Sequence, residues 1–147
     1  MAAVPCLVAA ALLAFPPPAR PQASPPPSPY KVVVHPGNAA TALTRQELSA
    51  IFLGRKTAWA DGTRAVPIDQ VEASPVREAF SRTVHGRKPA SVKSYWLQLL
   101  FSGRGVPPVE KAGDDQVLEA VRARAGAVGY VAAGARTEGV KVLQVRP

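Results

Sequence analysis

The stretch DQVEASPVREAF, residues 69–80, carries residue types at a spacing that suits the binding of an anion. Ser74 is followed by Pro75, a pair typical of the first turn of a helix, because serine caps free N–H groups and proline loses no hydrogen bond there. These N–H groups and the helix dipole place about half a positive charge at such a turn. A serine hydroxyl beside them can donate to an oxyanion. Ser74 is therefore either a cap alone or a cap that also borders an anion site, and these residues by themselves favour the cap.

Other kinds of chemistry find little support in the sequence. The histidines His35 and His85 stand on different predicted elements without metal-ligand spacing, and the single cysteine, Cys6, excludes an intrachain disulfide and a cysteine-based zinc site. No serine lies in a G-x-S-x-G elbow, and no glycine-rich loop of the nucleotide-binding type is present. The sequence therefore predicts a protein that is not an enzyme and that uses neither a metal nor a cofactor.

The chain is strongly basic, with a formal net charge of +8 at pH 7. Such a chain attracts nucleic acid, anionic lipid or small anions. The densest group of basic side chains lacks the interleaved aromatic residues that stack on bases; it consists of Arg82, His85, Arg87, Lys88 and Lys93. We therefore expect a solvated basic face and no nucleic-acid partner.

Residues 6–15, CLVAAALLAF, form an unbroken apolar run near the N-terminus. The run is too short to cross a bilayer as a helix, which needs about 20 residues, but it suits the core of a secretory signal. We interpret residues 1–23 as a signal peptide cut after Ala23, and residues 24–30 as a proline-rich linker. Because no lysine or arginine precedes the run, a disordered apolar tail stays the alternative. The signal peptide implies a periplasmic or secreted protein whose mature chain has no transmembrane helix.

Strands and helices alternate along residues 31–147. β-Branched and apolar runs predict strands over 30–35, 64–69, 127–132 and 140–145. Helical spacing with start and stop signals predicts helices over 43–54, 74–86, 88–103 and 114–126, and a loop over 104–113. Thr44 and Glu47 form a capping box at the start of the first helix, and the fourth helix begins with two acids. The third helix is expected to turn one apolar face inward, formed by Val92, Tyr95, Trp96, Leu99 and Leu100. This order indicates one α/β domain in which about four helices pack on a mostly buried mixed sheet of about four strands.

Three motifs resemble those of phosphate-type substrate-binding proteins of ABC transporters. They are LSAIFLGRKTAWADG at residues 48–62, SPVREAF at 74–80 and GAVGYV at 126–131. The resemblance covers roughly residues 31–145. It implies a type 2 periplasmic-binding-protein-like domain, of which this chain has a single lobe.

The resemblance also implies a site for a tetrahedral oxyanion. In this family a strand leads into a Ser-Gly-Thr-type helix start, and an arginine on the strand helps to grip phosphate. By position, the strand end corresponds to Asp69 and Gln70 and the helix start to Ser74 and Val76, while Arg77 lies in the first turn.

This chain departs from the family pattern at each of those places. Asp69 or Gln70 takes the position of the arginine, Val76 replaces a threonine, and Pro75 removes one N–H. Arg77 can supply the missing positive charge, or it can pair with a nearby acid, Glu72 or Glu78.

Two functions follow from the resemblance. The first is an exported solute-binding-like protein that holds phosphate or a similar oxyanion at a helix N-terminus. The alternative is a lobe whose ligand site has decayed and that acts as an envelope protein-interaction module. Because one lobe buries only half of a ligand, a homodimer or an envelope protein partner can rebuild a cleft.

Overall fold

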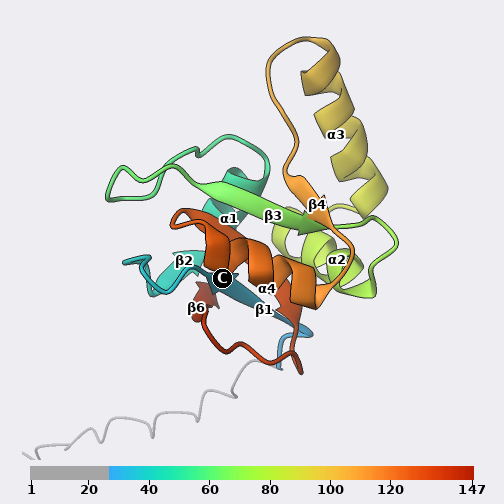
Figure 1. Ribbon diagram of the computed structural model, residues 1–147. Helices are drawn as coiled ribbons and strands as arrows, with labels where there is room; N and C mark the ends of the chain where they lie inside the picture. The colour runs from blue at the N-terminus through green and yellow to red at the C-terminus, as the bar shows by residue number, and fades with distance from the viewer. Residues whose placement is uncertain (1–26) are drawn as a thin grey trace, which may run out of the picture.

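A six-stranded mixed sheet lies at the centre of the structure, in the order β2-β6-β1-β5-β3-β4 (Figure 1). This computed structural model describes residues 27–147, so the signal peptide expected over residues 1–23 lies outside the described part of the chain. The strands are β1 (Tyr30–Val34), β2 (Ala42–Thr44), β3 (Val66–Gln70), β4 (Val109–Lys111), β5 (Ala127–Ala132) and β6 (Lys141–Arg146). The helices are α1 (Arg45–Phe52), α2 (Pro75–Phe80), the π-helical turn η1 (Ser81–His85), α3 (Pro89–Phe101) and α4 (Asp114–Ala123). The prediction of a mixed α/β fold is confirmed.

β1 and β5 form the middle of the sheet. β1 pairs antiparallel with both β5 and β6. β3 runs parallel to β5 on one side and to β4 on the other, and β2 runs parallel to β6. Both middle strands are almost continuously apolar, VVV in β1 and AVGYVA in β5, because helices cover both faces of the sheet there.

Helices α1, α2 and η1 cover one face of the sheet, and α4 covers the other. On the first face the ring of Phe80 stacks on that of Tyr130, with the centroids 3.8 Å apart. On the second face α4 approaches β5 so closely that a Cβ at Gly129 would lie 2.7 Å from Cγ1 of Val117. The two helical layers therefore fix the position of β5, which carries one side of the site described below.

The helix starts follow the signals in the sequence. Thr44 and Glu47 form the capping box predicted for α1. Ser74 caps α2, and η1 continues it as a π-helical turn. Gly86, with φ +65°, ends this segment in the left-handed region that glycine adopts without strain. The helix predicted over 74–86 is thus one continuous helical segment.

Helix α3 projects from the body of the domain, and only part of its apolar stripe is covered (Figure 1). Val92 and Trp96 are buried with Leu53. Leu100, which the helical spacing placed on the same inner face, is 46% exposed. That prediction was wrong, because periodicity gives the direction of a stripe but not how far a neighbouring element extends over it.

Two short strands lie where the sequence did not predict them. β4 falls inside the segment 104–113, which was expected to be a loop, and β2 directly precedes α1. Each strand has three residues, too few for an alternating pattern to show. Within residues 27–147, no helix is both long enough and apolar enough to cross a membrane.

Candidate functional site

The carboxyl ends of three parallel strands meet at one edge of the sheet. β3 ends at Gln70, β4 at Lys111 and β5 at Ala132, and helices α2 and α4 begin at this edge. In open α/β sheets ligands bind outside the carboxyl ends of the strands, where helix starts face the ligand. The residues that the sequence proposed for an oxyanion lie at this edge, as the last two residues of β3 and the start of α2.

Ser74 caps α2, and its hydroxyl already has an acceptor. Its Oγ accepts a hydrogen bond from the backbone N–H of Arg77 at 3.4 Å, which confirms the predicted cap. The same Oγ donates to Oε1 of Gln70 at 2.7 Å. Because a serine hydroxyl has one hydrogen to donate, an oxyanion can receive it only when Gln70 gives it up.

The side chain of Gln70 is fixed at both ends. Its Nε2 donates to Oδ1 of Asp114 at 2.9 Å and to the carbonyl oxygen of Tyr130 at 3.0 Å. The other oxygen of Asp114, Oδ2, accepts from the backbone N–H of Ala132 at 3.2 Å. Asp114 is the first residue of α4, so its carboxylate lies at a helix start, where negative charge is stabilised.

Arg77 is buried, with 3% of its surface exposed, and is held between two carboxylates. Its Nη2 lies 3.3 Å from Oδ2 of Asp69, and its Nη1 donates to Oε1 of Glu110 at 2.6 Å and to the carbonyl oxygen of Gln70. The nearby acids considered from the sequence are not its partners. Glu72 pairs with Lys93, and Glu78 pairs with Arg82.

Asp69 joins this cluster to the middle of the sheet. Its Oδ1 accepts from the hydroxyl of Tyr130 and, at 2.9 Å, from the backbone N–H of Gln70. Burial raises the pKa of the Asp69 carboxyl, although Arg77 and the Tyr130 hydroxyl oppose this. Burial also raises the pKa of Tyr130, and the neighbouring Asp69 charge adds to the effect. The charged form of Asp69 is therefore held in a site that penalises it.

Val76 differs from the other four proposed residues. Its side chain packs against the apolar core of the α1–α2 face, so only its backbone can face a ligand. Three residues of the cluster were not predicted to belong to it. Asp114 was visible only as an acid at a helix start, Tyr130 only as part of GAVGYV, and Glu110 lay in a presumed loop. No local signal joins them, because strand pairing brings them together.

Neither histidine is among these residues. Nδ1 of His35 accepts from the backbone N–H of Gly37 at 3.0 Å. Nδ1 of His85 lies 2.9 Å from the hydroxyl of Ser49. Burial lowers the pKa of His85 to about 4, and nearby arginines add to this. In the part of the chain that the structure describes, no three His, Cys, Asp or Glu side chains are grouped so that they could hold a metal ion.

A groove of about 260 Å³ leads from the buried ion pairs toward α3. Its polar end consists of Asp69, Arg77 and Glu110, with Lys93 beside them. Its apolar walls come from α3 and from the segment before β4, and they are formed by Trp96, Leu97, Leu100, Pro107 and Pro108. The guanidinium of Arg77 thus borders a hollow, although internal partners hold it.

Comparisons with known proteins find similarity at the level of structure. No protein-family model and no curated protein matches the chain. An ABC-type phosphate transport receptor from Vibrio cholerae superposes with a TM-score of 0.62 at 21% identity, over 79% of this chain and 45% of the receptor. The fold is periplasmic-binding-protein-like and corresponds to a single lobe.

Further structures give the same result. A substrate-binding protein of the phosphate ABC transporter type from Clostridium perfringens, solved with bound phosphate, has a TM-score of 0.63 at 20% identity, over 79% of this chain and 45% of its own. For a phosphate-binding protein from Stenotrophomonas maltophilia the TM-score is 0.55 at 24% identity, over 80% and 39%. This chain thus spans less than half of the length of these proteins, and at such identities the similarity establishes the periplasmic-binding-protein-like fold alone.

Proposed function

We propose that this chain is an exported solute-binding lobe whose ligand is phosphate or a similar oxyanion. The observation that carries the proposal is the meeting of a capped helix start with a buried guanidinium at the carboxyl edge of the sheet. The seat consists of the Ser74 hydroxyl, the Val76 backbone N–H and the Arg77 guanidinium, with Asp69 and Gln70 at its border. The similarity to phosphate-binding proteins supports the choice of ligand. Export follows from the signal peptide interpreted over residues 1–23.

Binding at this seat requires an exchange of partners. Ser74 turns its hydroxyl from Gln70 to the ligand, and the ligand takes a place now held by a carboxylate beside Arg77. A charged Asp69 opposes this exchange, because it repels an anion and competes for Arg77. A protonated Asp69 releases Arg77 and can donate to the ligand. Since burial raises the pKa of Asp69, we expect the oxyanion to bind more tightly as the pH falls.

This expectation is tested by calorimetric titration of the full chain at low salt, at about pH 7.5 and about pH 5. Sulfate is the first ligand, because it stays a dianion over this range and so separates protonation of the protein from protonation of the ligand; phosphate follows. We expect saturable binding at millimolar concentrations that becomes several-fold tighter at the lower pH, as proton linkage to Asp69 requires.

A pair of variants separates the anion site from the helix cap. Ser74→Asp keeps an N-cap of equal quality but removes the donor and adds negative charge, so binding should weaken at least about tenfold, as one lost charged hydrogen bond would cause. Ala125→Asp adds the same charge in an exposed turn before β5, at the opposite edge of the sheet, and should bind like the parent. The absence of heat for both ligands at both pH values, up to about ten millimolar, would refute the proposal.

The internal bonding of the same residues motivates a second candidate function. Ser74, Gln70 and Arg77 all donate to groups of the chain itself, as expected of a lobe that keeps the fold but has given up its ligand. Such a lobe serves as an interaction module for another protein. The titration distinguishes the two, because an interaction module gives no sulfate or phosphate heat in either the parent or Ser74→Asp.

A further inference from the structure

Helix α3 is exposed over much of its length but carries hardly any charge. Lys93 is its only charged residue among 13, and the loop that follows, 102–108, adds only Arg104. An exposed helix normally presents charged and polar residues to water. Depletion of charge is a property of the central part of protein–protein interfaces. The composition of α3 therefore indicates a face that meets another protein surface.

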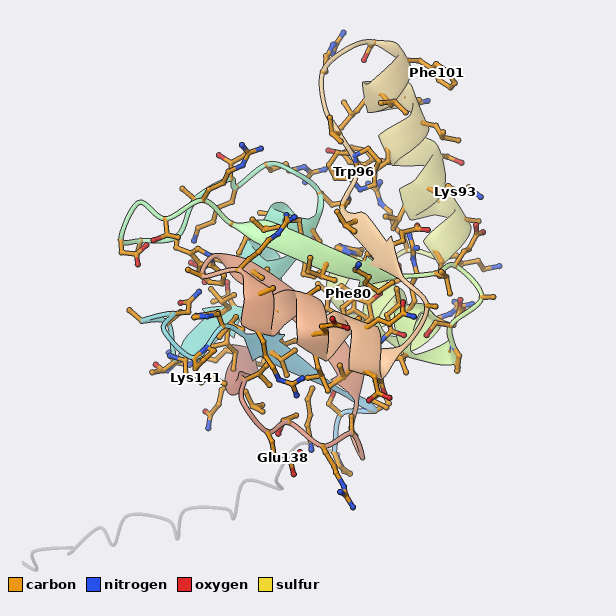
Figure 2. The ribbon with its side chains drawn as sticks, in the orientation of Figure 1. Phe80, Lys93, Trp96, Phe101, Glu138 and Lys141 are labelled. Carbon is orange, nitrogen blue, oxygen red and sulfur yellow. The ribbon has the colours of Figure 1, made fainter. Side chains whose placement is uncertain are left out.

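Large apolar side chains gather at the far end of this helix. Phe101, in the last turn of α3, is 85% exposed and points away from the domain (Figure 2). Val106, in the following loop, is 80% exposed, and Leu97, Leu100 and Val109 are exposed as well. Clustered apolar exposure of this kind marks interaction surfaces, whereas scattered apolar residues do not.

The same end of α3 also forms one wall of the apolar groove. The groove, of about 260 Å³, has α3 on one side and the following loop on the other. Its apolar lining consists of Trp96, Leu97, Leu100, Pro107 and Pro108. The exposed Phe101 and the groove therefore belong to one continuous surface of one helix and its following loop, which we call the α3 face (residues 96–109).

We propose that the α3 face is the docking surface for a second copy of this chain, in a twofold contact in which Phe101 of each copy enters the groove of the other. A twofold pair uses the same patch on both subunits, so the patch must complement itself. The α3 face meets this requirement, because it carries both an apolar projection and an apolar hollow.

The size of the α3 face sets the strength of this contact. The helical part of the α3 face is the last two turns of α3, about 9 Å long and about 10 Å wide. With the loop beside it, the face covers on the order of 300 Å² in each copy, less than half of the ~800 Å² per partner of a standard interface. We therefore expect a weak dimer that forms only as the protein is concentrated.

Charge gives the contact a distinctive salt dependence. Each chain carries a formal net charge of +8, so two copies repel one another, and salt screens that repulsion. The α3 face itself has few charges to be screened. Association should therefore strengthen as salt is raised. An acidic partner held by the basic residues would show the opposite dependence, because salt weakens attraction between opposite charges.

Sedimentation velocity of the full chain tests the proposal, over about 5 to 500 µM and in about 0.05 and 0.5 M NaCl. Phe101→Ser removes the apolar projection. Val142→Ser is the matched control, because Val142 is an exposed apolar residue on β6 rather than on α3. We expect the parent and Val142→Ser to dimerise with rising concentration, more tightly at high salt, and Phe101→Ser to dimerise at least about tenfold more weakly, as the loss of one buried aromatic anchor implies.

Several results would overturn the assignment. These are a monomer at every concentration, a dimer that Phe101→Ser leaves unchanged, a dimer that both variants weaken equally, and a dimer that weakens as salt is raised. Neither substituted side chain is part of the buried core, so thermal unfolding of both variants should match that of the parent. Loss of dimer in Phe101→Ser can then be assigned to the surface rather than to unfolding.

Discussion

Arg77 links two carboxylates from a position almost entirely shielded from water. Its guanidinium meets Asp69 and Glu110, and although burial disfavours its charge, Asp69 and Glu110 raise its pKa. A buried ion pair need not add stability overall, because desolvation offsets much of the attraction. Removing one partner of such a pair is destabilising, because the other charge then stays buried and uncompensated.

We therefore predict that Arg77→Met lowers the free energy of unfolding by about 3–5 kcal/mol, measured by urea denaturation at pH 7. The double variant Arg77→Met, Asp69→Asn should recover part of this loss, because the orphaned carboxylate is gone. Arg82→Met is the control. Arg82 pairs with Glu78 on the surface, where such a pair contributes at most about 1 kcal/mol. Equal losses in the two arginine variants would show that Arg77 does not compensate a buried charge.

At the level of residues, the sequence predicted the local relations and missed the distant ones. The cap by Ser74 could be predicted, because capping involves residues three positions apart and is encoded in the segment itself. The partner of Arg77 could not. Glu110 comes from 33 positions further along the chain, and it reaches Arg77 through the pairing of β3 with β4. No pattern in the sequence revealed β4.

The packing of α4 on β5 is the contact between elements that leaves the least room. A Cβ at Gly129 would lie 2.7 Å from Cγ1 of Val117 and 3.4 Å from Cγ2 of Val121. Both neighbours are β-branched and stiff, so they cannot turn aside. The short separation between helix and sheet therefore depends on glycine at this position.

Gly129→Ala should accordingly destabilise the protein by about 1–3 kcal/mol, the usual result of overpacking, and lower the thermal midpoint. Gly134→Ala serves as the comparison, because a Cβ there meets nothing within 4 Å and its backbone is not left-handed. It should change stability by less than about 0.5 kcal/mol. Adding Val117→Ala to Gly129→Ala should restore part of the loss. Two glycine variants with the same midpoint would show that α4 moves away from β5 freely.

At the level of elements, periodicity and end signals located the four main strands and the helices. These signals could not show how much of each helix is covered by neighbouring elements. The stripe on α3 correctly marked Val92 and Trp96 as buried, yet Leu100 on the same stripe is 46% exposed, because it lines an open groove instead of packing against a neighbouring element. The burial of a residue depends on the element that packs against it, and the apolar pattern within one helix gives no information about that neighbouring element.

Across the whole molecule, two titratable groups shielded from water, His85 and Asp69, affect acid stability in opposite directions. Burial lowers the pKa of His85 to about 4 from an ordinary value of 6.5. Between these two pH values the His85 imidazole is therefore protonated in the unfolded chain but neutral in the folded chain. Stability therefore falls as the pH drops from about 6.5 to about 4. Burial raises the pKa of Asp69 above its ordinary 3.8, so the folded chain binds that proton first, and stability rises as the pH falls through the raised pKa toward 3.8.

These signs give a prediction for the whole fold. His85→Asn replaces the imidazole by an amide, which does not titrate. The parent loses unfolding free energy between about pH 6.5 and about pH 4, and in the variant this loss should be smaller by as much as about 3 kcal/mol, the free energy that corresponds to the pKa difference of His85. Urea unfolding at several pH values measures it. In this variant the Asp69 contribution stands alone, and stability should rise on acidification before other carboxylates protonate. His35→Asn, which replaces the histidine after β1, is the control for the loss of an imidazole. If His85→Asn kept the parent slope, the acid sensitivity would have to come from carboxylates whose pKa folding lowers, and Glu47, whose pKa the hydrogen bonds of Thr44 lower, would become its first candidate.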